Sequence, residues 1–89
     1  MYTFIASFDE GIYIAQVVSD TVPGAVESWA KLLIEERFLG EASEAMAKGA
    51  LEDLEDYSKI EDRENVWCFT PYAEGYGVAI INIVKTVRE

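Results

Sequence analysis

Residues 2–19 read YTFIASFDEGIYIAQVVS, and the alternation in this stretch decides the fold class. Large and small side chains alternate from Tyr2 to Phe8, which is the period of a β-strand. The turn Asp9-Glu10-Gly11 follows, and its glycine suits the positive φ of a three-residue bulged hairpin. β-Branched residues over Ile12 to Ser19 then predict the returning strand. The pairing predicted from this turn places Phe8 opposite Ile12, Ala6 opposite Ile14 and Tyr2 opposite Val18.

Two helices are predicted after the hairpin. The first runs from about Pro23 to Phe38, behind an N-cap at Asp20 or Thr21, with the proline in the first turn where a missing N–H costs little. Its apolar positions share one side: Val22, Val26, Trp29, Leu32 and Leu33. Gly40 is the predicted C-terminal stop, and a second periodic segment runs from Glu41 to about Tyr57.

Two further strands are predicted near the C-terminus, at Asn65–Thr70 and Val78–Val87, joined by a turn over Pro71–Gly77. The last strand is apolar on both faces, which is typical of a central position in a sheet. The predicted fold is a single α+β domain over residues 1–89. It is a two-layer ββααββ arrangement, with a four-stranded antiparallel sheet and both helices on one face.

The charge balance excludes several function classes. The 89 residues hold 17 Asp and Glu against 7 Lys and Arg, a net charge of -10, and no histidine. A Ser-His-Asp triad is therefore excluded. The chain also lacks the residue that most often serves as a general acid or base and as a transition-metal ligand. The few cations are scattered singly, which argues against nucleic acid. We expect no enzyme activity, no cofactor and no metal site, and a basic protein as the partner.

Acidic side chains concentrate in the second half of the predicted helical region, where 11 of the 17 acids lie between residues 35 and 64. Like charges three or four positions apart on a helix cost about 0.3 kcal/mol a pair, which a basic partner would relieve. The alternative is a solvated helix face. Aromatic residues in the following turn add contact area with a polar tip. The predicted partner-binding residues are Glu52, Asp53, Glu55, Asp56, Tyr72 and Tyr76.

The predicted sheet has an uncovered apolar face if both helices lie on the other one. Such a face binds a second copy or a partner unless the sheet curls over it. The pairing given above places three residues there as a predicted homodimer interface: Ile5, Tyr13 and Val17.

Cys68 is the single cysteine, so an intrachain disulfide is excluded and a reducing, cytoplasmic location is favoured. Its neighbours Trp67 and Phe69 predict a buried structural thiol, with the indole in the core. No apolar run approaches the roughly 18 residues of a membrane span, and the N-terminal residues lack the basic region of a signal peptide. We expect no membrane partner.

The same N-terminal stretch resembles a known family. Tyr2-Thr3-Phe4-Ile5 and Asp9-Glu10-Gly11-Ile12-Tyr13-Ile14-Ala15-Gln16-Val17, followed by Thr21 and a helix, are similar to the start of HicB-like antitoxin domains, whose hairpin reads Y-x-V…D-x-G-x-Y-x-A-x-V. The resemblance covers residues 1–38. The family's Leu-Pro-Gly-Cys segment is replaced by residues 19–24, and no DNA-binding module follows, so no functional residue is carried over. The resemblance implies a small β-rich scaffold that binds and silences another protein.

These observations favour a non-enzymatic, acidic protein-binding module, of the antitoxin or immunity type, that inhibits a basic partner. The alternative is a small-ligand-binding or regulatory domain that dimerises through its open sheet face, with a pocket near Trp67, Tyr72 and Tyr76.

Overall fold

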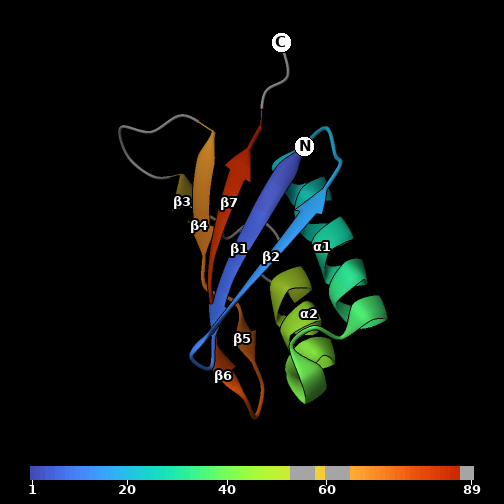
Figure 1. Ribbon diagram of the computed structural model, residues 1–89, viewed down its shortest axis with the longest axis vertical. Helices are drawn as coiled ribbons and strands as arrows, with labels where there is room; N and C mark the ends of the chain where they lie inside the picture. Colours follow the sequence, from blue (N-terminus) through green and yellow to red (C-terminus); the bar gives the residue numbers. More distant parts are fainter. Residues whose placement is uncertain (53–57, 60–64, 87–89) are drawn as a thin grey trace.

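The computed structural model describes residues 1–52, 58–59 and 65–86 (Figure 1). The helices are grouped in the middle of the chain, with two strands before them and the other strands after them. The elements are β1 (Tyr2–Phe8), β2 (Gly11–Val17), α1 (Val22–Glu36), the 3₁₀-helix η1 (Gly40–Ala42), α2 (Ser43–Glu52), β3 (Ser58–Lys59), β4 (Val66–Phe69), β5 (Tyr72–Ala73), β6 (Gly77–Val78) and β7 (Ile80–Lys85).

The larger sheet has the strand order β2-β1-β7-β4-β3, and each pair of adjacent strands in it is antiparallel. The α+β class and the four predicted strands are confirmed as β1, β2, β4 and β7, and β7 is central as expected. The ββααββ order is incomplete, because β3 lies in a segment predicted as a polar connection. A small second sheet, β5–β6, begins in the segment predicted as a turn and ends at Val78, the first residue of the last predicted strand.

The predicted register of the first hairpin is wrong by one residue. Phe8 pairs with Gly11, Ala6 with Tyr13 and Tyr2 with Val17. The turn has two residues, and both of them take a positive φ, 48° at Asp9 and 65° at Glu10. Two positive φ angles define the type I′ turn, whose twist matches that of paired strands, so the hairpin adopts it without glycine at either position. A one-residue slip moves every side chain of β2 to the opposite face.

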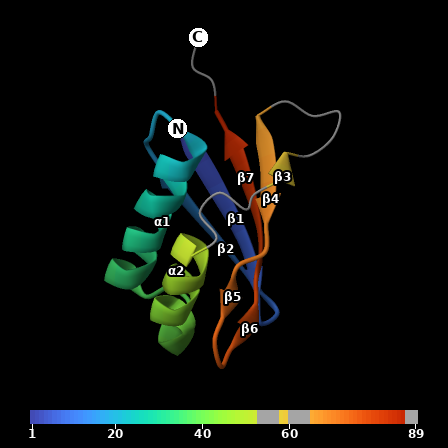
Figure 2. The same ribbon diagram turned by 180° about the vertical axis from the view of Figure 1, so that it is seen from behind.

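The core lies between the large sheet and α1, and it continues into the buried side of α2, which includes Met46. Phe4, Ile81 and Ile83 are fully buried on neighbouring strands, and Trp29 of α1 is fully buried above them. The Trp29 and Phe4 rings stack with their centroids 5.4 Å apart and an interplanar angle of 6°. Figure 2 shows α1 and α2 next to each other, and α2 packs mainly against α1 and β5.

The N-terminus of α1 follows the prediction and the C-terminus does not. The Thr21 hydroxyl accepts a hydrogen bond of 3.1 Å from the Gly24 N–H, which makes it the N-cap. Arg37 ends the helix in the left-handed conformation, with φ 49°, and its N–H donates to the Leu33 carbonyl at 2.9 Å. The predicted stop, Gly40, instead begins η1. Of the predicted apolar side, all members are buried except Leu32, which is half-buried.

Helix α2 begins at Ser43, later than predicted, because η1 occupies the preceding turn. The Ser43 hydroxyl is buried and accepts a hydrogen bond of 3.1 Å from the Leu39 N–H. Residues 53–57 of the predicted helix lie outside the described residues. Gly49 faces β5 so closely that a Cβ there would overlap the carbonyl oxygen of Tyr72. A glycine at this position therefore lets α2 lie against the backbone of the small sheet.

We predict that Gly49→Ala lowers the free energy of unfolding by about 1–3 kcal/mol. Alanine favours the helix by about 1 kcal/mol, but its methyl group has to displace backbone, which outweighs that gain. Urea denaturation measures the change. Lys48→Ala is the matched control, because Lys48 is exposed and its 4.0 Å pair with Glu52 lies in solvent; a change within about 0.5 kcal/mol is expected. A more stable Gly49→Ala protein would contradict the close packing of α2 on β5.

Candidate functional site

The predicted acidic surface is represented in the described residues by Glu52 alone, because Asp53, Glu55 and Asp56 lie outside them. Glu52 is exposed at the end of α2 and lies 4.0 Å from the ammonium group of Lys48. Each described Asp and Glu is exposed. The negative charge is therefore available at the surface for contact.

The two predicted contact tyrosines are both exposed, Tyr72 by 56% and Tyr76 by 49%, but they line different depressions. Tyr72 and Glu52 line the same depression of about 330 Å³. Tyr76 lines another of about 380 Å³ together with Asp9. The structure therefore joins Tyr72 to the α2 surface, and Tyr76 to the first hairpin.

The placement of Tyr13 and Val17 on the uncovered face is wrong. Because the register is shifted, Val17 shares a face with Tyr2 and is 8% exposed, and Tyr13 packs against Phe38 with ring centroids 6.2 Å apart. Ile5 does lie on the opposite face, beside Ile14. Sequence reasoning missed Ile12 and Ile14, which are 69% and 68% exposed. The signal that could have found them is the two-residue turn, since it fixes the register.

The face of the large sheet turned away from the core is here called the open face. The cross-strand pairs place on it side chains that are apolar or neutral, and none of these described positions is charged. Gln16 donates a hydrogen bond of 3.1 Å to the hydroxyl of Thr3 and so is satisfied locally. The open face consists of Thr3, Ile5, Ser7, Ile12, Ile14, Gln16, Val66, Cys68, Ile80, Asn82 and Val84.

The predictions that Cys68 is a buried thiol and that Trp67 lies in the core both need correction. Cys68 is half-buried on the open face, opposite Asn82, and not enclosed in the core. Trp67 is also half-buried and packs at the margin of the core, with its ring centroid 6.0 Å from that of Tyr2. Trp29, and not Trp67, is the central indole, since it is fully buried.

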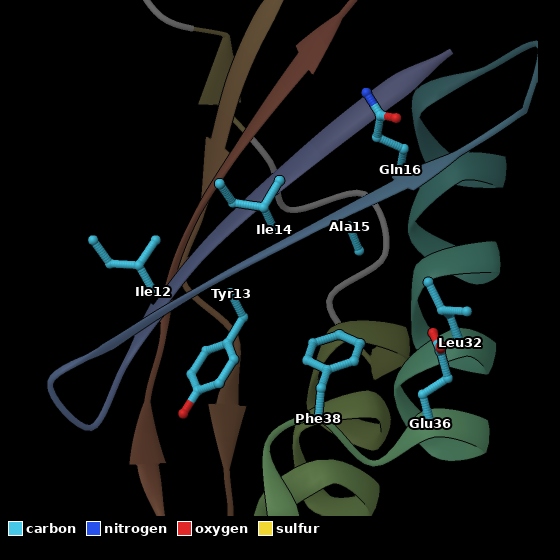
Figure 3. A pocket seen from close by; sticks show the side chains of 8 residues that line it. All are labelled: Ile12, Tyr13, Ile14, Ala15, Gln16, Leu32, Glu36 and Phe38. Atoms are coloured by element: carbon cyan, nitrogen blue, oxygen red, sulfur yellow. The ribbon is translucent and has the colours of Figure 1, made fainter.

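A groove follows the outer edge of β2 and is here called the edge groove (Figure 3). Its volume is about 700 Å³. Tyr13 and Ala15 point from β2 toward it, while Phe38 and Leu32 form its other side, with Glu36 at the rim. The same strand sends Ile12 and Ile14 to the other side of the sheet, as Figure 3 shows. The groove is thus an open depression lined by both apolar and polar groups, with Gln16 and the Glu36 carboxylate among the polar ones.

The described residues bring together no group of three or more His, Cys, Asp or Glu side chains that could hold a metal ion. Among the same residues, no helix has the length and apolarity to cross a membrane. The features that the structure does assemble are an uncharged sheet face and the edge groove.

Comparisons with protein families, with curated proteins and with solved structures found no match to this chain.

We predict that Val17→Asp destabilises the protein by about 2 kcal/mol or more relative to Ile14→Asp. Both substitutions place the same side chain in the same strand, but the first buries a carboxylate and the second leaves it in water. Thermal or urea unfolding of the two variants measures the difference. The reverse order of stability would restore the register expected from a three-residue turn.

Proposed function

We propose that this chain is a non-enzymatic, acidic protein-binding module that inhibits a basic partner by covering it. The open face supplies apolar contact, and the acidic hairpin tip beside it supplies charge. In this arrangement both helices form one layer over the other face of the sheet. The likeness of residues 1–38 to the hairpin of HicB-like antitoxin domains supports a silencing role of this kind.

The observation that carries the proposal is the segregation of charge. A chain of net charge -10 has no charged residue among the described positions of its open face. Ile12, Val78 and Ile80 are each more than half exposed, and they surround a depression that Asp9 and Glu10 complete. An apolar patch with a charged rim is the usual anatomy of a protein interface.

The backbone of the hairpin tip supports the same interpretation. Asp9 and Glu10 both have a positive φ, which costs a residue other than glycine about 1 kcal/mol. Glycine would avoid this cost in a type I′ turn. The type I′ turn accounts for the conformation, and contact with a basic partner would account for the choice of two carboxylates at the rim of an apolar patch.

Glu52 of α2 and Tyr72 of β5 form a second acidic and aromatic surface where these two elements meet. Its part in binding stays a prediction, together with that of Asp53, Glu55 and Asp56, and it would extend contact with a basic partner.

We predict that reversing both tip charges, Asp9→Lys with Glu10→Lys, slows association with the partner by about tenfold or more at low salt. Complementary charge acts mainly on the rate of encounter, and exposed charges are screened over about 8 Å at physiological ionic strength. The partner is first captured with the tagged protein from native lysate and identified. Its association rate constant is then measured at low and high salt.

The matched control is Glu27→Lys with Glu35→Lys, which makes the same change in net charge on the exposed side of α1. We expect the control to slow association less than the tip variant does. Equal rates for both variants at both salt concentrations, with the fold confirmed by circular dichroism, would contradict electrostatic contact at the tip.

The open face also favours the second candidate, a domain that dimerises through this face, because two uncharged faces meet without burying a charge. We predict in that case a mass near twice 10.0 kDa by light scattering, and a monomer for Ile80→Glu. Alkylation of Cys68, which is the single cysteine and lies on this face, should be slower in the dimer. A wild-type protein that stays monomeric at high concentration contradicts the dimer.

A further inference from the structure

The outer edge of β2 is an unpaired strand edge. In the described part of the chain, β2 pairs with β1 alone and is the first strand of the sheet order. The other end of the sheet is β3, which has two residues. Of the two edges, β2 therefore offers the longer row of backbone groups.

The parity of the β1 pairing identifies which backbone groups point outward. The Thr86 N–H donates to the Met1 carbonyl at 2.8 Å, and this pair continues the ladder between β1 and β7. Hydrogen-bonded and non-bonded pairs alternate in an antiparallel ladder, so the odd-numbered residues along β1, counted from Met1 just before it, direct their backbone groups toward β7. The even-numbered residues of β1 therefore form their backbone hydrogen bonds with β2. Their partners on β2 are Gly11, Tyr13, Ala15 and Val17, so the N–H and C=O groups of Ile12, Ile14 and Gln16 face away from β1.

This edge lacks the devices that normally prevent pairing. Edge strands are usually protected by lysine or other charges, by proline, by a bulge or by shortness. Residues 11–17, GIYIAQV, contain no charge and no proline, and their register with β1 is continuous over all seven positions. The edge groove lies beside this strand, so side chains of an added strand would have room between β2 and α1.

We propose that β2 binds an extended segment of a basic partner protein by β-strand addition, with apolar side chains of that segment in the edge groove and a lysine or arginine at Glu36. Strand addition at β2 rests on the proposed function and specifies its partner. Backbone hydrogen bonds give such binding its affinity, and pockets for alternate side chains give its specificity. Leu32 and Phe38 provide the apolar contact, and Tyr13 reaches the groove from the strand.

Charge favours a basic segment over a second copy of this chain. Glu36 is exposed at the groove rim, and no ion pair between it and another described residue is formed. A second copy would bring together two chains that each carry a net charge of -10. A segment with a cation opposite Glu36 is attracted instead, and the uncharged β2 residues do not oppose it.

The test uses a short strand-forming peptide of valine and threonine with one central lysine, and a comparison peptide with glutamate in its place. We expect the lysine peptide to bind more tightly, and Glu36→Gln to reduce this preference by about threefold, as for a solvent-exposed ion pair. Ile14→Pro should weaken binding by about tenfold or more, because it removes an outward N–H while leaving the bonds to β1 intact. Ile14→Val retains both that N–H and an apolar side chain on the open face, and it is the reference against which the effect of proline is measured.

Two measurements keep the outcome decisive even if Ile14→Pro disturbs the fold. Amide exchange at Ile12, Ile14 and Gln16 should slow when the lysine peptide is added, whereas Tyr13 and Ala15 are protected already. Two peptide isomers, N-methylated at alternate sets of amides, should differ in affinity. In one of them the methyl groups replace the amide hydrogens that face β2, and this isomer should bind more weakly. Isomers that bind alike, or exchange rates that do not change, would overturn strand addition.

The remaining outcomes separate the two proposals. If Ile14→Pro folds and still binds the captured partner with the wild-type rate and affinity, strand addition is wrong and the protein-binding function stands. If the protein alone has twice its monomer mass, and Ile14→Pro makes it a monomer, the edge joins two copies and the basic segment is wrong. A captured partner whose binding responds to neither the tip charges nor Ile14→Pro overturns both.

Discussion

The stack of Phe4 on Trp29 is the contact on which the rest of the structure depends. The two rings are fully buried and nearly parallel, and they join β1 to α1. Trp29 also meets Phe69 of β4 edge to face at 6.3 Å, and Phe38 after α1 at 6.4 Å. Aromatic pairs contribute about 0.5–1.5 kcal/mol beyond their burial, which matters in a domain whose total stability is about 0.05–0.15 kcal/mol per residue. One indole thus fixes the helix over the sheet and holds Phe38 at the edge groove.

Local rules predicted the elements well where the periodicity was strong. The alternation of β1 and an N-cap of α1 at Asp20 or Thr21 were both predicted, and both are local properties of the chain; the structure shows the cap to be Thr21. The turn between the strands was assigned to the wrong type, because glycine is the usual residue at a positive φ. Asp9 and Glu10 take that conformation instead, since the twist of the paired strands favours it. This one wrong turn assignment shifted the predicted register, so Tyr13 and Val17 were placed on the open face, where the structure has Ile12 and Ile14.

The candidate site was harder to predict because it depends on distant partners. That β2 is an edge strand follows from β7, which pairs with the other side of β1 from more than 60 residues along the chain. The edge groove depends further on how α1 packs beside β2, and Phe38, which follows the end of that helix, forms part of the groove wall. No pattern within the hairpin or the helix contains this information. Composition did predict that charge would lie at the surface, and each described acid is exposed.

The distribution of charge explains how such a chain could keep an unprotected edge without pairing with itself. Lysine on an edge strand normally prevents this, but a lysine in β2 would also repel a basic partner. Here the strand is neutral and the repulsion comes from the whole surface, which carries -10. At physiological ionic strength two copies repel each other at separations up to about 8 Å, beyond which salt screens the charges, whereas a basic segment is attracted over the same range. If β2 binds a basic segment as proposed, net charge of one sign serves both purposes: it discourages self-association at β2, and it attracts a segment of the opposite sign to the edge.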